Sequence, residues 1–70
     1  MLKGVFLKIY YESDPHMGVQ VIYDLNGERQ YDGFNSFYIF NAWVSSEFLC
    51  YELVEITDAN YQQLSQQGVL

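Results

Sequence analysis

The stretch VQVIYDLNGERQYDGF, residues 19–34, contains the strongest fold signal in this chain. Asn26-Gly27 divides the stretch, and this dipeptide favours a type I′ turn because both central residues of that turn need a positive φ. Apolar and aromatic residues precede the turn from Val19 to Leu25, and a more polar segment, Glu28 to Phe34, follows it. The stretch therefore predicts a β-hairpin whose second strand is exposed or lies at a sheet edge.

A further strand is predicted before the hairpin, in residues 3–11. Its odd positions (Val5, Leu7, Ile9 and Tyr11) are apolar, and its even positions (Phe6, Lys8, Tyr10 and Glu12) are mixed. This alternation is typical of a strand with one face on a core. The residues from Ser13 to Gly18 are predicted to form the connecting loop, since Asp14-Pro15 disfavours helix and glycine permits a positive φ.

The segment FYIFNAWV, residues 37–44, is ambiguous. As a helix it would begin after Asn35 or Ser36 and place Phe37, Phe40 and Val44 on one face. Its aromatic and β-branched content favours a strand instead. Residues 48–56 predict another strand, in which Cys50 would be a small buried hydrophobe.

The clearest helix is predicted near the C-terminus. Thr57 or Asp58 would cap it, Tyr61 and Leu64 would face inward, and Gly68 would end it. The expected fold class is therefore α+β, in a single domain covering residues 1–70. It would have a small antiparallel sheet of four to five strands, with the short helix packed on or beside it.

Seventy residues bury a small core, and such a chain often needs an additional stabilising element. One cysteine excludes an intrachain disulfide, and the lone His16 has no neighbouring ligand for a zinc site. We therefore expect no cofactor or metal, and we expect a homodimer. A single unpaired cysteine suits a reducing cytoplasm.

The charge of −6 is unevenly placed. All three basic residues occur in the first thirty positions, and from Tyr31 onward there are five acids and no Lys or Arg. Direct binding to nucleic acid or to an anionic membrane is therefore not expected, because both require clustered cations. The N-terminal segment also lacks the long apolar run of a signal peptide or membrane helix.

No motif for catalysis or phosphate binding is present. His16 and Cys50 could meet only through the fold, and Glu52 and Glu55, three apart on a strand, would point to opposite faces. Asp24 to Glu28 lacks the spaced carboxylates of a calcium loop. The chain is therefore expected not to be an enzyme.

The run VEITDANYQQL, residues 54–64, resembles the strand-then-helix ending "ITDxxYQxL" of some phage tail-fibre assembly proteins. It covers eleven of the seventy residues. The resemblance implies a phage or mobile-element origin. Small acidic proteins of such origin often occupy a host protein's surface, as anti-restriction and anti-CRISPR inhibitors do.

These observations predict a non-catalytic protein-binding module that occupies a basic surface of a host protein in the cytoplasm. The carboxylates expected to form its acidic face are Asp32, Glu47, Glu52, Glu55 and Asp58. The tyrosines expected to reach the surface as anchors are Tyr10, Tyr23, Tyr31 and Tyr38. The alternatives are a self-associating assembly protein of phage-tail type and a dimer that binds a small ligand between aromatic residues.

Overall fold

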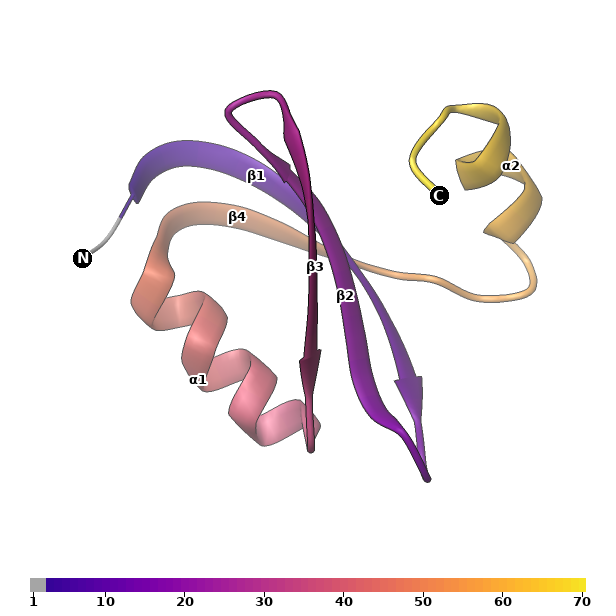
Figure 1. Cartoon of the computed structure of the whole chain (residues 1–70), viewed down its shortest axis with the longest axis horizontal. Helices are drawn as coiled ribbons and strands as arrows, with labels where there is room; N and C mark the ends of the chain where they lie inside the picture. Colours follow the sequence, from indigo (N-terminus) through magenta and orange to yellow (C-terminus); the bar gives the residue numbers. More distant parts are fainter. Residues whose placement is uncertain (1–2) are drawn as a thin grey trace.

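The computed structural model describes residues 3–70, with side chains from Phe6 onward. The described elements, in chain order, are β1 (Lys3–Asp14), β2 (Gly18–Leu25), β3 (Glu28–Phe34), α1 (Phe37–Glu47), β4 (Phe48–Glu55) and α2 (Tyr61–Gln66). The strands form one sheet in the order β3-β2-β1-β4. Figure 1 shows this sheet crossing the centre of the molecule, with α1 and α2 on opposite sides of it. The expected α+β class is confirmed.

Turn chemistry explains the three strands that come first. Asn26 and Gly27 have φ values of 54° and 82°, which is the backbone of the predicted type I′ turn between β2 and β3. Between β1 and β2, the Asp14 carboxylate accepts hydrogen bonds from the backbone N–H groups of His16 (2.7 Å) and Met17 (2.9 Å). This turn is shorter than the predicted loop, because β1 continues to Asp14 and β2 begins at Gly18.

The strand favoured for residues 37–44 is wrong, because this segment lies in helix α1. The side chain of Ser36 caps the helix and accepts a hydrogen bond from the N–H of Ile39 at 3.2 Å. Phe40 and Val44, four residues apart on one helical face, are both 0% exposed. Burial of this stripe against the sheet therefore outweighs the strand preference of the aromatic residues.

Helix α1 also sets the direction of β4. Because α1 carries the chain back across the sheet, β4 runs parallel to β1, and the other two pairings are antiparallel. The sheet is thus mostly antiparallel, as predicted, with one parallel pairing that the sequence reading did not anticipate. The sequence predicts that this strand continues to Ile56, whereas β4 ends at Glu55. The Ile56 N–H nevertheless donates a hydrogen bond to the Tyr11 carbonyl oxygen of β1, at 2.7 Å.

The core lies between α1 and the face of the sheet formed by odd-numbered residues of β1 and β2, here called the α1 face. Its buried side chains are Ile9, Val19, Val21, Tyr23, Phe40, Val44 and Phe48. Leu7 and Tyr11 pack against this cluster, as the alternation predicted, and the side chain of Val5 lies outside the described part of the chain. The even-numbered residues of β1 and β2 form the opposite face, here called the open face.

Helix α2 forms a smaller apolar contact, in which Leu64 and Ile56 are buried. Leu64 faces inward as predicted, but the same prediction for Tyr61 is wrong, because Tyr61 is 54% exposed. Asn60, rather than Thr57 or Asp58, precedes the helix. Its side chain holds the turn by accepting from the Thr57 N–H (2.7 Å) and donating to the Glu55 carbonyl oxygen (2.8 Å). Gly68 has a φ of 79° and ends the helix as predicted. Neither helix in residues 3–70 has the length and apolar character needed to cross a membrane.

Candidate functional site

The outer surface of α1 exposes uncharged aromatic and aliphatic side chains. Tyr38 is 83% exposed, Ile39 46% and Phe37 40%, and Ala42 is also exposed. No charged residue occurs in α1 before Glu47. Of these residues the sequence predicts only Tyr38 to be at the surface, because the strand expected for residues 37–44 does not separate an outer from an inner side. The helical alternative capped by Ser36 would have placed Tyr38, Ile39 and Ala42 away from the buried face, although it placed Phe37 beside Phe40 and Val44.

Two of the predicted acidic residues, Asp32 and Glu47, lie beside the same tyrosine. The hydroxyl of Tyr23 donates a hydrogen bond to Oδ2 of Asp32 at 3.2 Å. Burial raises the pKa of Tyr23 to about 12, and the negative charges of Asp32 and Glu47 add to this effect. A neutral tyrosine hydroxyl therefore anchors the Asp32 carboxylate on the α1 face.

Glu55 lies on the same face, at the other edge of the sheet. Asp32 pairs with Val21, Val21 with Tyr11, and Tyr11 with Glu55, so these residues form one row across the four strands. Burial raises the pKa of Tyr11, and the nearby charge of Glu55 raises it further. Asp32 and Glu55 thus flank the sheet on the side that α1 covers.

The remaining two predicted acids do not join this group. Glu52 pairs with Lys8 of β1 and therefore belongs to the open face, and Asp58 lies in the turn before α2. The expectation of a single face formed by all five acids is therefore wrong. Side-chain alternation along β4 separates Glu52 from Glu55.

The four predicted tyrosine anchors occupy different environments. Tyr38 and Tyr31 are 83% and 68% exposed, but they lie on opposite sides of the sheet. Tyr10 is half-buried on the open face. The expectation that Tyr23 reaches the surface is wrong: it is 7% exposed, and its ring contacts Trp43 and Phe48 at centroid distances of 5.7 and 5.8 Å.

Cys50 and His16 are well separated. Cys50 pairs with Phe6, eight residues before the Asp14 end of β1, and His16 lies beyond that end. At about 3.3 Å per strand residue, the two side chains are more than about 20 Å apart. Cys50 is exposed, so its predicted burial is wrong. Among the residues that the structure describes, no three His, Cys, Asp or Glu side chains gather into a metal-binding group.

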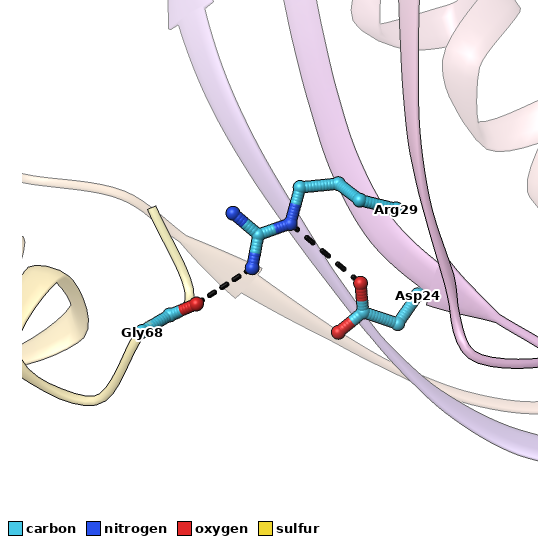
Figure 2. Close-up of polar contacts among 3 residues, drawn as sticks. All are labelled: Asp24, Arg29 and Gly68. Carbon is cyan, nitrogen blue, oxygen red and sulfur yellow. Dashed lines mark hydrogen bonds and ion pairs between the residues drawn. The ribbon is translucent and has the colours of Figure 1, made fainter.

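The open face differs from the α1 face because it contains a cavity whose wall includes basic residues. A shallow cavity of about 180 Å³ lies there, and its wall includes Tyr10, Ile22 and Val69 together with Lys8 and Arg29. Arg29 is held in two directions: its Nε is 3.6 Å from Oδ1 of Asp24, and its Nη2 donates to the carbonyl oxygen of Gly68 at 2.6 Å (Figure 2). The C-terminal segment is therefore fastened across this face of the sheet.

No protein-family model, curated protein or solved structure gives a significant match to this chain. The resemblance of residues 54–64 to tail-fibre assembly proteins stays a prediction.

Proposed function

We propose that this chain is a non-catalytic protein-binding module that docks through the outer surface of α1 on a partner with a basic surface. The observation that carries the proposal is the contrast between the two sides of the sheet. The α1 side combines an exposed Tyr38 and Ile39 with flanking carboxylates of Asp32, Glu47 and Glu55. Both cations with described side chains, Lys8 and Arg29, lie on the open face.

This arrangement suits a protein interface. Such interfaces have an apolar, aromatic centre and a polar rim, and tyrosine is a frequent centre of binding energy. An acidic rim favours a partner whose own rim is basic, and it speeds the encounter at low salt. Proteins that bind nucleic acid carry such basic surfaces, because they neutralise phosphates with Lys and Arg. The proposed setting is the cytoplasm of a host cell, with the chain acting as a phage or mobile-element inhibitor of such a protein.

The test uses three forms of the immobilised protein: wild type, Tyr38→Ala, and Tyr31→Ala as a control for an exposed tyrosine on the other face. Each is incubated with host lysate at low and high salt, and the captured proteins are identified and purified. We expect a basic protein that wild type and Tyr31→Ala retain and that Tyr38→Ala loses. Its affinity should fall as salt rises, because exposed charge pairs are screened.

Two results would contradict the proposal. One is a partner that Tyr38→Ala binds as tightly as wild type, and the other is the absence of any salt-sensitive partner. A final measurement with purified partner and the variant Glu55→Gln tests the rim. We expect a slower association rate with little change in dissociation.

A second candidate function is self-association through β4. Within the described sheet β4 pairs only with β1, so the other edge of its residues 49–54 is open to pairing with another strand. Leu49 beside this edge is 61% exposed. We propose a second copy of the chain as the strand that pairs there, giving a homodimer with a continuous sheet. Sedimentation velocity at micromolar concentration tests it, and a monomer would exclude it.

A further inference from the structure

The cavity on the open face lies on the other side of the sheet from the surface proposed to bind a protein. It is bounded by β1, β2, the start of β3 and the C-terminal segment. Its volume of about 180 Å³ exceeds the roughly 150 Å³ of an engineered protein cavity that binds benzene. Its volume is therefore large enough for one aromatic ring with a small substituent.

Apolar side chains form much of the wall. Tyr10 and Ile22 pair across β1 and β2 and are both half-buried, and Val69 contributes from the C-terminal segment. Phe6, also in the wall, is 64% exposed. A flat apolar group would remove part of this aromatic surface from water, and ring contacts of this kind add to the effect of burial.

The charged residues of the wall favour an anionic ligand. Lys8 and Arg29 both line the cavity, although the chain carries a net charge of −6. Arg29 is occupied by Asp24 and by the carbonyl oxygen of Gly68. Lys8 makes no ion pair or hydrogen bond to any of the residues that the structure describes, even though Glu52 is its register partner on β4. One ammonium group therefore remains available beside an apolar wall.

We propose that this cavity binds a small aromatic anion, with its ring against Tyr10, Ile22 and Val69 and its carboxylate or other anionic group on Nζ of Lys8. The Asp24 carboxylate, also in the wall, is paired with Arg29 and so repels the anion less than a free carboxylate would. Charge assistance favours an anion over the matched neutral compound. The aromatic wall favours a ring over a simple inorganic anion.

The first experiment titrates isotope-labelled protein with benzoate, with the neutral benzamide and with sodium phosphate, followed by amide chemical shifts. Benzoate should give saturable shifts at Lys8, Tyr10, Ile22 and Val69, with a dissociation constant in the millimolar range expected for so few atoms. Benzamide should bind several-fold more weakly. Phosphate should give no saturable shift at Ile22 or Val69. Equal binding of benzoate and benzamide would overturn the proposal, and so would benzoate shifts spread over both faces.

The second experiment tests the wall with variants. Lys8→Met keeps the side-chain length and should weaken benzoate about tenfold, the effect of one charge-assisted contact, while leaving benzamide unchanged. Lys8→Arg should retain benzoate. Glu12→Gln, on the same strand and face but outside the cavity, should match wild type. Ile22→Trp fills the cavity and should abolish binding of both compounds, with the remaining amide spectrum confirming the fold. Unchanged benzoate affinity in Lys8→Met would overturn the assignment of Lys8.

Discussion

Arg29 and Gly68 are 39 residues apart in the chain, yet Nη2 of Arg29 donates a hydrogen bond to the Gly68 carbonyl oxygen at 2.6 Å (Figure 2). The same guanidinium faces Asp24 at 3.6 Å, across the second residue pair of the β2–β3 hairpin after the turn. Arg29 thus joins the β2–β3 hairpin to the C-terminal segment that follows α2. It complements the backbone hydrogen bond from the Val69 N–H to the Leu64 carbonyl oxygen, which closes α2.

Replacing Arg29 should therefore loosen the C-terminal segment more than the sheet. In Arg29→Gln we expect the free energy of unfolding to fall by about 1 kcal/mol, the typical net value of a hydrogen bond, because solvent screens the charge of Arg29. Hydrogen exchange should speed up at Val69 and leave Ile9 nearly unchanged. Glu28→Gln, the neighbouring exposed position on the α1 face, serves as the control. Unaltered exchange at Val69 would mean that Arg29 does not fasten the segment.

Two isoleucines, Ile9 in the core and Ile39 on the outer surface of α1, test the placement of this helix. Ile9 is 0% exposed and Ile39 is 46% exposed, so the same substitution removes one methylene from the core and one from the surface. Ile9→Val should lower the free energy of unfolding by about 1 kcal/mol, whereas Ile39→Val should change it by less than about 0.5 kcal/mol. Urea unfolding measures both. Equal losses would show that residues 37–44 pack differently.

The parts of the fold that the sequence predicted correctly depend on local chemistry. Asn26-Gly27 specifies its turn through the backbone of two residues, and Gly68 ends α2 in the same way. The strand prediction for residues 37–44 is wrong because aromatic side chains suit either a strand or the buried face of a helix. Burial of Phe40 and Val44 decides between them, and this depends on contacts with the sheet. The parallel β1–β4 pairing follows only once α1 is known to be a helix.

The sequence predicts which acidic residues are candidates for the site, but it does not predict which of them share a face of the sheet. Alternation along the strand already implied that Glu52 and Glu55 point to opposite faces, so one face could not contain both. Which of them would join Asp32 depended on the register of β4 against β1, which no local pattern encodes. Cys50 is exposed for a related reason. It lies on the open face, paired with the exposed Phe6.

Alanine substitutions at two glycines with nearly equal φ separate the cost of backbone strain from the cost of a steric clash. Gly18 and Gly27 have φ values of 81° and 82°. A Cβ at Gly18 would collide with the carbonyl oxygen of Phe34, and a Cβ at Gly27 would meet open space. Gly27→Ala should cost about 1 kcal/mol for the left-handed backbone alone. Gly18→Ala should cost at least about 2 kcal/mol, because the β2–β3 edge must also shift. Equal urea midpoints would contradict the close approach.

The buried hydroxyl of Tyr23 makes stability depend on alkaline pH. Its pKa is raised to about 12 in the folded chain, chiefly by burial and then by Asp32, from an ordinary value of 10.0. The folded state keeps the proton where the unfolded state loses it, so this contribution is fully present below pH 10 and disappears as pH rises through 12. Tyr23→Phe should lower stability at pH 8, because Asp32 loses its donor, and should show a weaker decline between pH 10 and 12. Burial and Glu55 also raise the pKa of Tyr11, so part of the decline should remain in this variant. Tyr31→Phe, at an exposed position, should follow the wild-type curve, and a decline in Tyr23→Phe as steep as in wild type would contradict the assignment.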